Sequence, residues 1–430
     1  MTSLVVGAGR SGVALARHLT GVGEHVRVID SKPAPELEHT LAQLVPGVEV
    51  SVGGYDERVL EGIDAVYASP GVPWDSELLN LARAAGIAVS SEIALFLRLC
   101  PGTVVGITGT NGKTTTTTLT GTVLSAGDKP VIVGGNIGET VLDRLEEITP
   151  EHWVVLELSS FQLESIEKPH LHVGVILNIT PDHLDRHGTF EHYVDLKARA
   201  IEFAFPNDFA VLNGRDEVVR RLAGRTNAKV VWFDQHRPAP PMALPGRHNL
   251  DNALAAAAVG RIAGLSDDTI DSAIRSFRGV EHRLELVGEW EGVRWYNDSK
   301  ATNPDAARVA LRAFPDTPVV LIAGGYGSGF ELGPWVVDVL ANVESVVLIG
   351  ASADLLAEQL RGHRKVLRAG SLEEAIEVAA SMARPGGVVL LSPAYKSFDM
   401  FKDYEDRGRR FKALVRHKFG AADASGVHTT

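Results

Sequence analysis

Short apolar runs alternate with helical patterns along almost the whole chain, and this alternation constrains the fold more than any other feature of the sequence. The runs are LVVGAG, VRVID, AVYASPG, VVGITG, WVVLEL, VGVILNIT, VVLIAGG, SVVLIG and VVLLSP. Buried strands of parallel sheets read as apolar runs, and a crossover helix joins each strand to the next. The sequence therefore predicts an α/β fold with parallel sheets, in which ligands bind at the carboxyl ends of the strands.

Two breaks divide this pattern. LCPGTVV at residues 99–105 follows a helix expected to start near Ser90, and FRGVEHRLELV at residues 277–287 marks a second boundary. A chain of 430 residues is expected to form two or three domains, at roughly 100–200 residues each. We therefore predict three domains and a disordered tail, with the proline-rich segment 234–246 inside the middle domain. The predicted ranges are 1–92, 93–280, 281–419 and, for the tail, 420–430.

Charge and cysteine content narrow the class of function. The net charge of −12 argues against nucleic-acid binding but leaves an anionic substrate open. The one cysteine, Cys100, excludes an internal disulfide and indicates a reducing cytosol. Because Pro101 and Gly102 follow it, we interpret it as a structural thiol. No signal peptide and no run of the roughly 18–20 apolar residues of a membrane span is present, so we expect a cytoplasmic protein without membrane insertion.

The segment GITGTNGKTTTTTL at residues 106–119 is a candidate phosphate loop. The strict pattern fails, because Ile107 stands where its first glycine belongs, and the shorter stretch Gly109–Thr114 is judged on context. A β-rich run precedes the glycines and a helical pattern follows them, as a phosphate loop requires. Lys113 would then reach the β- and γ-phosphates, and the Thr114 hydroxyl would bind Mg²⁺. The alternative is a surface turn with a stray lysine.

Acidic and imidazole side chains end two of the neighbouring apolar runs. Glu157 ends WVVLEL, and Asp182, His183 and Asp185 follow VGVILNIT. An acid at the tip of a buried strand beside a phosphate loop is a candidate Mg²⁺ ligand, although a solvated strand end gives the same pattern. With Glu157 and Thr114 in the same sheet, we also expect His183 to bind metal or phosphate.

A second glycine motif opens the chain. Gly7, Gly9 and Gly12 follow the first apolar run, and Asp30 ends the second. By itself this motif predicts a dinucleotide site with the acid on a ribose hydroxyl, and the runner-up function is therefore an NAD-dependent dehydrogenase. The first domain, however, is only about 90 residues long and reads as roughly half of a dinucleotide fold. A UDP-type ligand fits such a half better.

Nine motifs in order give the chain a resemblance to the Mur ligase family over nearly its whole length. They are GTNGKTT, GGNIG, ELSSFQLE, NITPDHLDRHG, LKARAIEFA, GRHNLDNALAAAA, EHRLELV, NDSKATNP and LSPAYKSFDMFKDYEDRG. ELSSFQLE and the last motif are similar to those of members that add glutamate to UDP-N-acetylmuramoyl-L-alanine. The resemblance implies a Rossmann-like first domain, a central ATPase-like domain with a mainly parallel sheet, and a Rossmann-like third domain. It also implies an ATP-driven reaction in which the substrate carboxylate is phosphorylated and the amine of glutamate attacks the acyl phosphate.

The resemblance also assigns residues to the substrate and nucleotide sites. The uridine-nucleotide site would comprise Gly9, Arg10, Ser11, Gly12, Asp30, Ser31, Lys32, Ser69, Pro70 and Gly71, with Asn136, Ser159 and Gln162 on the muramoyl part. ATP would contact Gly109, Thr110, Asn111, Gly112, Lys113, Thr114, Thr115, Asn249, Asn252, Arg283 and Asp298.

Two Mg²⁺ ions are implied, with Thr114, Glu157 and His183 among their ligands. Lys197 matches a lysine that CO₂ converts to a carbamate, which would make it a ligand for the second ion. The catalytic set is therefore Lys113, Glu157, His183 and Lys197. Without the resemblance, Lys197 reads as a solvated helix lysine.

The expected glutamate site contains departures from the family. Its residues are Lys300, Thr302, Ser328, Lys396, Ser397, Phe398 and Tyr404. Ser328 stands where a lysine is expected, Lys396 replaces a small residue, and Tyr404 replaces a phenylalanine. If the cation moved from one loop to the other, the glutamate carboxylate would move with it. The sequence therefore favours D-glutamate by family default and keeps L-glutamate as an alternative.

Other classes of function stay open at this point. A dehydrogenase would bind NAD and show no ATPase activity. A non-catalytic nucleotide-binding module would keep the loops but tolerate loss of Glu157 or Lys197. A folate-type polyglutamate ligase shares the middle domain but should lack the first one. For the Mur-type reading we expect a monomeric enzyme of the bacterial cytoplasm.

Overall fold

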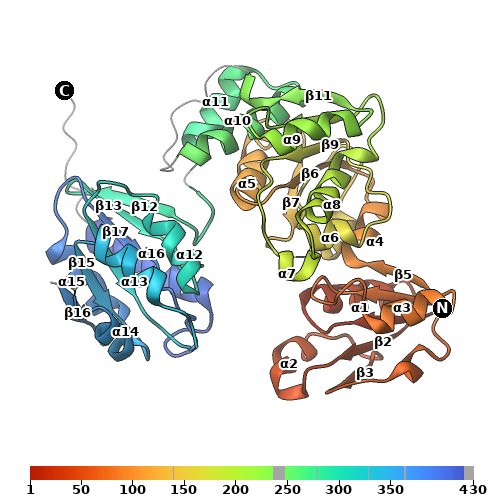
Figure 1. Cartoon of the computed structure of the whole chain (residues 1–430), viewed down its shortest axis with the longest axis horizontal. Coiled ribbons are helices and arrows are strands. Elements are labelled where there is room, and N and C mark those ends of the chain that lie inside the picture. The colour runs from red at the N-terminus through yellow and green to blue at the C-terminus, as the bar shows by residue number, and fades with distance from the viewer. Residues whose placement is uncertain (139, 236–246, 278, 328, 363–364, 421–430) are drawn as a thin grey trace. The chain divides into compact units, whose positions relative to one another are not determined.

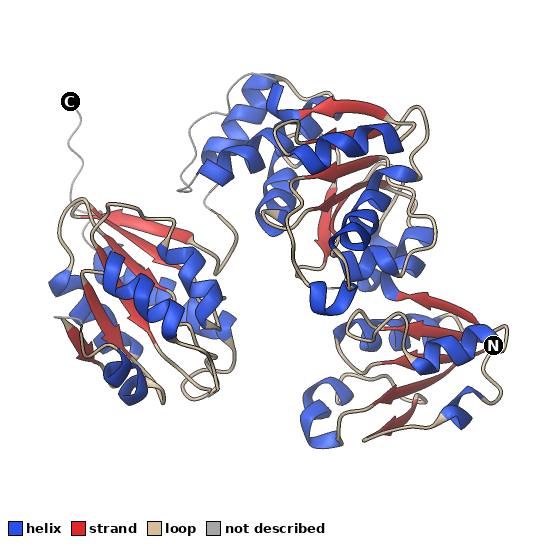
Figure 2. Ribbon diagram, in the orientation of Figure 1, coloured by secondary structure: helices blue, strands red, loops and turns tan. Residues whose placement is uncertain are grey.

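The computed structural model describes the chain apart from residues 139, 236–246, 278, 328, 363–364 and 421–430. The chain folds into two compact units. The first comprises residues 1–240 with 250–274, and the second comprises residues 241–249 with 275–430. The first unit contains two β-sheets and the second contains one, and helices pack on each of them (Figure 1 and Figure 2).

The first sheet has five parallel strands in the order β3-β2-β1-β4-β5. They are β1 (Thr2–Val6), β2 (His25–Asp30), β3 (Glu49–Val52), β4 (Ala65–Ala68) and β5 (Ala88–Ser91). The helices are α1 (Arg10–Gly21), α2 (Ala34–Leu41), the 3₁₀ helix η1 (Glu57–Leu60), α3 (Glu77–Ala84) and α4 (Glu92–Leu99). Five of the six strands of a dinucleotide-binding sheet are present, so the expectation of half such a fold was wrong. The strand order reverses at β1 and β4, where sheets of this kind bind ligands.

The second sheet has six parallel strands in the order β11-β10-β9-β6-β8-β7. They are β6 (Thr103–Thr108), β7 (Val131–Gly135), β8 (Trp153–Glu157), β9 (Val173–Ile176), β10 (Phe209–Leu212) and β11 (Lys229–Trp232). The helices are α5 (Lys113–Leu124), α6 (Ser160–Glu164), α7 (Leu184–His187), α8 (Phe190–Glu202), α9 (Glu217–Leu222), α10 (Arg247–Ile262) and α11 (Asp267–Ser276), and the 3₁₀ helices are η2 (Val141–Glu147), η3 (Ala223–Arg225) and η4 (Phe233–Gln235). Because β6 lies between β8 and β9, the loops that follow these three strands leave the same edge of the sheet.

The third sheet has the order β12-β13-β17-β14-β15-β16. Among the described strand pairs of this sheet, β12 and β13 are antiparallel and the others are parallel. The strands are β12 (Glu285–Trp290), β13 (Val293–Asn297), β14 (Val319–Ala323), β15 (Ser345–Leu348), β16 (Val366–Arg368) and β17 (Val388–Leu391). The helices are α12 (Pro304–Leu311), α13 (Gly333–Asn342), α14 (Ala353–Gln359), α15 (Leu372–Met382) and α16 (Tyr404–Gly420).

Apolar side chains are buried on both faces of the second sheet. This packing holds the strand ends from which the loops begin. Val105 and Ile107 of β6 pack in one apolar cluster with Leu254 of α10. Val104 lies in the other cluster, which includes Ala198 of α8. Successive side chains of a strand point to opposite faces, so helices cover this strand on both sides. A strand held in this way positions the polar residues at its end rigidly.

The nine apolar runs form strands β1, β2, β4, β6, β8, β9, β14, β15 and β17, which confirms the predicted α/β class. The first predicted break lies between α4 and β6, and the second between α11 and β12. The proposed tail beyond Gly420 and most of the proline-rich segment lie outside the described residues. Within the described ranges, none of the helices combines the length and the apolar character needed to cross a membrane.

Candidate active site

The loop between β6 and α5 has the backbone of a phosphate-binding loop. Gly109 and Gly112 adopt positive φ angles of 154° and 85°, which glycine accepts without strain. A Cβ atom on Gly112 would also collide with Oδ1 of Asn252. The loop is held from outside by Asn178, which accepts a hydrogen bond from Asn111 N at 2.8 Å and donates one to Asn111 O at 3.0 Å. No role was predicted for Asn178, although it lies just after β9, at the carboxyl end of the strand, where functional polar residues are expected.

Lys113 begins the helix that follows the loop, and its side chain folds back over it. Its Nζ donates hydrogen bonds to Gly109 O at 3.0 Å and to Thr110 O at 2.8 Å. Thr114 is buried and Thr115 half-buried in the first turn of the same helix. The amide groups of a helix N-terminus, together with a lysine, form a site for a phosphate group.

Only some of the threonine hydroxyls of α5 have hydrogen-bond partners, and those of Thr117 and Thr120 are buried without one among the described residues. Thr118 donates to Thr114 O at 2.9 Å and Thr122 donates to Thr118 O at 3.1 Å, so these hydroxyls satisfy themselves within the helix. Thr116 instead donates to Oδ1 of Asn252 at 3.1 Å. That contact fixes α10 against the phosphate loop and places one of the two predicted ATP-contacting asparagines beside it.

Glu157 ends β8 with a carboxylate that is only half satisfied. The residue is 3% exposed, and its Oε1 accepts a hydrogen bond from Nδ2 of Asn136 at 2.9 Å. Oε2 is buried and has no hydrogen-bond partner among the described residues. Glu157 pairs with Ile107 of β6 and with Gly135 of β7, so it lies at the same edge of the sheet as the phosphate loop. A buried carboxylate oxygen without a partner is costly unless something binds it.

Lys197 of α8 is buried at the same edge. It is 1% exposed, and its Nζ donates to Gly109 O at 2.8 Å and contacts Oγ1 of Thr108 at 3.5 Å. Burial, with a further contribution from the charge of Lys113, lowers the pKa of Lys197 from 10.5 to about 7. Reading this residue as a solvated helix lysine was therefore wrong, because the helix presents it to the interior of the site.

His183 lies in the loop between β9 and α7, and its side chain is less buried than those of Glu157 and Lys197. Its backbone has φ 51°, its side chain is about half exposed, and its ring packs against Phe161 with 5.2 Å between ring centroids. Nε2 of His183 lies 3.6 Å from Oδ2 of Asp182. The side chain is accessible to a ligand, as the predicted metal role requires.

Ser159 and Gln162 form a capping box at the start of α6. The Ser159 hydroxyl accepts from Gln162 N at 3.2 Å, and Oε1 of Gln162 accepts from Ser159 N at 3.0 Å. These interactions orient the helix directly after Glu157. The predicted contacts of both side chains with the muramoyl substrate stay a prediction.

A cavity of about 390 Å³ lies at the carboxyl edge of the first sheet. Of the residues predicted for the uridine nucleotide, the following line it: Gly9, Arg10, Ser11, Asp30, Ser31, Lys32, Ser69, Pro70 and Gly71. Gly12 instead packs against Gly7 O, where a Cβ would collide. Both carboxylate oxygens of Asp30 accept backbone amides, from Ala8 at 2.8 Å and from Lys32 at 2.9 Å. Asp30 thus shapes the loops around the cavity.

The second unit contains the other predicted ATP residues. Asn249 is buried at the start of α10, and Arg283 is exposed. Asp298 is buried and accepts hydrogen bonds from Leu284 N at 3.1 Å and from the Ser392 hydroxyl at 2.7 Å. Burial raises the pKa of Asp298 from 3.8 to about 7.

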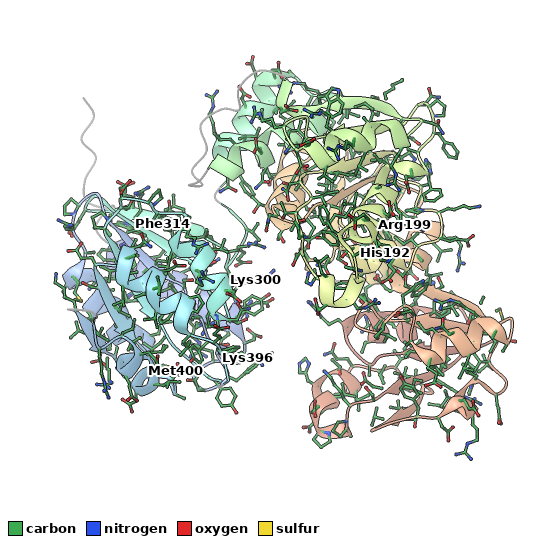
Figure 3. The ribbon with its side chains drawn as sticks, viewed as in Figure 1. His192, Arg199, Lys300, Phe314, Lys396 and Met400 are labelled. Atoms are coloured by element: carbon green, nitrogen blue, oxygen red, sulfur yellow. The ribbon has the colours of Figure 1, made fainter. Side chains whose placement is uncertain are left out.

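Arg407 holds together the two loops that carry the predicted glutamate-binding lysines. Its guanidinium is fully buried and donates to the hydroxyl and the carbonyl oxygen of Ser299, both at 2.9 Å, and to Tyr395 O at 3.2 Å. Ser299 precedes Lys300, and Tyr395 precedes Lys396, the two lysines labelled on this unit in Figure 3. Sequence reasoning assigned Arg407 no role, and a buried arginine leaves no signal in hydrophobic periodicity.

The predicted glutamate residues differ in exposure. Lys396 is exposed, Ser397 is buried and Phe398 is 62% exposed. Thr302 is half-buried and its N–H donates to Lys300 O at 2.8 Å, ahead of the predicted cap and first-turn proline of α12. The carbonyl oxygen of Lys396 accepts from Tyr326 N at 2.7 Å, which bridges its loop to the loop after β14. Ser328, the other departure, lies outside the described residues.

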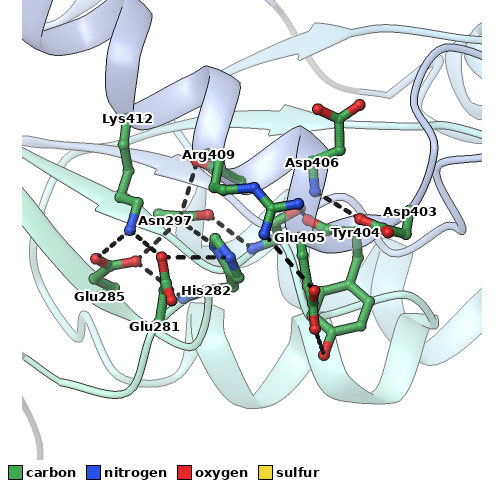
Figure 4. A network of polar contacts seen from close by, with 12 residues as sticks. Glu281, His282, Glu285, Asn297, Asp403, Tyr404, Glu405, Asp406, Arg409 and Lys412 are labelled. Carbon is green, nitrogen blue, oxygen red and sulfur yellow. Dashed lines mark hydrogen bonds and ion pairs between the residues drawn. The ribbon is translucent and has the colours of Figure 1, made fainter. Parts of the chain in front are cut away.

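A polar network supports this region from the side of α16 (Figure 4). Lys412 donates to Glu281 at 2.7 Å and to Glu285 at 2.9 Å. Glu285 accepts from His282 N at 2.9 Å, and Nδ1 of His282 contacts Nδ2 of Asn297 at 2.9 Å. Tyr404, at the start of the same helix, uses its carbonyl oxygen to accept from the Ser299 hydroxyl at 2.8 Å. The network fixes the residues on either side of Asp298.

A glycine-lined loop before a helix, with a half-satisfied buried carboxylate at the same edge of a parallel sheet, is the architecture of an α/β nucleotide-binding protein. The family model described as the Mur ligase middle domain matches residues 107–240, and the Mur ligase, glutamate ligase domain matches residues 282–395. The Mur ligase MurD-like, N-terminal domain matches residues 1–91. The chain belongs to the Mur ligase family.

Relatives agree with this membership, and a solved structure agrees with the fold. The chain is 41% identical to a UDP-N-acetylmuramoylalanine–D-glutamate ligase of Desulfitobacterium hafniense, with 97% of both chains covered. It is 43% identical to a protein of the same name from Koribacter versatilis, with 96% of both covered. Its fold is similar to that of a UDP-N-acetylmuramate-alanine ligase of Thermotoga maritima, with a TM-score of 0.57, 21% identity and coverage of 97% of this chain and 100% of the other. These relatives give no support to a dehydrogenase or to a ligase for L-glutamate.

Proposed function

We propose that the protein joins D-glutamate to UDP-N-acetylmuramoyl-L-alanine in peptidoglycan precursor synthesis, with ATP converted to ADP and phosphate. The observation that carries this proposal is the phosphate loop with Glu157 and Lys197 buried at the same edge of the sheet. The names of relatives at 41–43% identity supply the substrates and the D enantiomer. A solved MurF ligase from Thermotoga maritima in complex with ADP, 18% identical, supports the fold alone.

The residues present fit a magnesium ion. Oε2 of Glu157 is a buried, unpartnered anionic oxygen, and Thr114 is buried in the first turn of the adjoining helix. Oxygen donors of this kind are the ones that Mg²⁺ prefers. Glu157, the Thr114 hydroxyl and His183 would hold the ions, which supply charge neutralisation as the phosphoryl group moves between two anions.

Lys197 fits the proposed carbamate. A primary amine must be neutral to attack CO₂, and burial brings the pKa of Lys197 down to about 7, so much of it is neutral near pH 7. The attack forms an N–C bond and releases one proton, which turns a buried amine into an anion beside Lys113. The anionic form would be a ligand for the second Mg²⁺ ion.

The remaining steps follow from binding and orientation. Lys113 and the amides of the phosphate loop would bind the ATP phosphates, and Asn252 against the loop would help to orient the nucleotide. Lys300 and Lys396 would bind the carboxylates of glutamate and keep its amine directed at the acyl phosphate. Because the amine is already nucleophilic when neutral, positioning supplies most of the rate acceleration in that step.

The organisation of the chain is part of the same proposal. We place a UDP-binding domain at 1–92, an ATP-binding domain at 93–280 and an amino-acid-binding domain at 281–419. The matched family models, at 1–91, 107–240 and 282–395, support these boundaries. The protein would act as a monomer in the bacterial cytoplasm.

The test is phosphate release with UDP-N-acetylmuramoyl-L-alanine, ATP and Mg²⁺, with each enantiomer of glutamate in turn. D-glutamate is expected to support turnover, and omission of any one substrate should abolish it. Activity with L-glutamate but not with D-glutamate would overturn the assigned enantiomer. It would favour the hypothesis that the carboxylate-binding cation has moved to Lys396. Inactivity with both enantiomers, in protein that still binds ATP, would overturn glutamate as the co-substrate.

A further inference from the structure

Three side chains with potential metal-binding atoms lie close together next to the predicted site, and the proposed reaction does not use them. Glu164 ends α6, His187 ends α7 and His192 lies in the first turn of α8. One carboxylate oxygen of Glu164 and one ring nitrogen of each histidine all lie within 4.8 Å of one another. Figure 3 labels His192, which is exposed, whereas His187 is only 5% exposed.

His187 has the environment of a metal-binding histidine. Its Nε2 lies 3.0 Å from the Ser160 hydroxyl, while Nδ1 is buried with no hydrogen-bond partner among the described residues. A histidine that binds a metal through one nitrogen usually donates its other N–H to a nearby oxygen, which fixes the tautomer. Burial lowers the pKa of His187 from 6.5 to about 4, so the ring is neutral near pH 7 and keeps its lone pair. The unpaired Nδ1 is costly in the absence of a ligand.

Glu164 can supply the third donor. Arg186 donates to its Oε2 at 3.1 Å, and Oε1 has no hydrogen bond within the described part of the chain. His192 is exposed, so an ion can reach this group of donors from solvent. Ligands of a tetrahedral zinc ion lie about 3.3 Å apart at bond lengths near 2.0 Å, so the donors must approach one another. The exposed side chain of His192 is free to make most of that movement.

We propose that Glu164, His187 and His192 form a binding site for a divalent transition-metal ion of the Zn²⁺ class, separate from the Mg²⁺ sites. Two imidazoles and one carboxylate suit Zn²⁺, Co²⁺ or Ni²⁺ better than Mg²⁺, which prefers oxygen ligands and water. Water would complete the coordination from the exposed side. This inference is independent of the ligase reaction proposed above.

The site has a direct structural connection to His183. The ring of Phe161 stacks on His187 at 4.9 Å between centroids and contacts His183 at 5.2 Å. A metal ion that shifts the His187 ring would therefore displace the aromatic ring on which His183 rests.

The test is titration of the tag-free protein with Zn²⁺, followed by calorimetry, in the presence of excess Mg²⁺ to occupy the hard-oxygen sites. One equivalent should bind, and His192→Ala should weaken the affinity by about tenfold or more. His417→Ala, which removes another exposed histidine in α16, is the matched control and should leave binding unchanged. Co²⁺ should give the visible absorption of a low-coordinate site, and His192→Ala should abolish it.

A second variant guards against a folding artefact. Glu164→Gln keeps an oxygen for Arg186 but removes the charge, and it should also weaken Zn²⁺ binding. The proposal is overturned if the parent protein binds no Zn²⁺ under these conditions or if His192→Ala and Glu164→Gln both bind as the parent does. It is also overturned if His183→Ala alone removes the bound ion, because that result assigns it to the predicted Mg²⁺ site.

Discussion

The carboxyl edge of the second sheet and the loops of the second unit are built in different ways. At the sheet edge, Glu157 and Lys197 are buried and their side chains are fixed by contacts with Asn136 and Gly109. In the second unit, Lys396 is exposed and it is the backbone of its loop that is fixed, through Tyr326 and Arg407. Fixed side chains suit the charged steps of phosphoryl transfer, whereas a fixed backbone with exposed side chains suits recognition.

This contrast predicts where substitutions act. A change at the sheet edge leaves a buried charge or donor without its partner, and the loss should appear in kcat. A change on the loops removes a solvent-exposed contact, and the loss should appear in the KM for the amino acid. The largest effects should therefore come from the sheet edge and the smallest from the exposed loops.

Lys113→Ala should have the largest effect. It removes the cation that lies across the phosphate loop, so kcat should fall by roughly 10³-fold or more, as expected for a group that stabilises charge in phosphoryl transfer. Steady-state phosphate release measures it. Lys129→Ala, an exposed lysine just after the same helix, is the control and should keep full activity. A rate within tenfold of the parent would remove the phosphate loop from the mechanism.

Glu157→Gln should follow, with a fall in kcat of roughly 100-fold. The amide oxygen can still accept from Asn136, but the buried negative charge on the unpartnered oxygen is lost. The Mg²⁺ concentration needed for half-maximal rate should rise as well. Asn136→Ala should lower kcat less, since it leaves the charge of Glu157 in place, although it should also raise the KM for UDP-N-acetylmuramoyl-L-alanine, which Asn136 is predicted to contact. Equal losses of kcat in the two variants would show that the hydrogen bond matters as much as the charge.

The pH dependence set by Lys197 should be a smaller effect, and it should lie at lower pH than that of an ordinary lysine. Its pKa is lowered to about 7, so the amine is protonated below pH 7 and cannot react with CO₂, and is neutral above it. The rate should therefore rise with pH up to about 7, by up to tenfold per unit, and level off above it. A carbamate signal from ¹³C-bicarbonate in NMR spectra should follow the same curve. An equally strong signal at pH 5.5 and pH 8.5 would contradict this cause.

The sequence predicted interior strands far better than edge strands. Nine apolar runs were identified, and every one lies inside a sheet. The six edge strands β3, β5, β7, β11, β12 and β16 were missed, and most of their residues are exposed or only partly buried. A strand buried on both faces has a continuous apolar sequence. A strand at the edge of a sheet is less covered, so its sequence is less apolar and is harder to recognise. The interior strands β10 and β13 were also missed; β13 carries Arg294 among its apolar residues.

The location of a candidate site residue was predictable where its residue type has one strong chemical use, and it was not predictable where the side chain supports another residue. The loop glycines, Lys113 and Glu157 follow from motif and strand position. Asn178 and Arg407 act by hydrogen-bonding backbone atoms of loops distant in sequence, which depends on tertiary packing alone. Lys197 shows the same limit, because a helix pattern does not say how deeply one polar residue is buried.

Lys396→Ala should have the smallest effect and bears most directly on the comparison. An exposed ion pair contributes roughly 1 kcal/mol or less, so the KM for D-glutamate should rise by about fivefold while kcat changes little. Because Lys396 contributes its carbonyl oxygen to the bridge with Tyr326, and alanine keeps that oxygen, the loop should hold its shape. Lys402→Ala, an exposed lysine six positions further on, is the matched control and should leave KM unchanged.

An unchanged KM in Lys396→Ala would exclude this lysine from glutamate binding. A fall in kcat as large as that of Lys113→Ala would instead place it among the residues of the chemical step and break the division between the two regions.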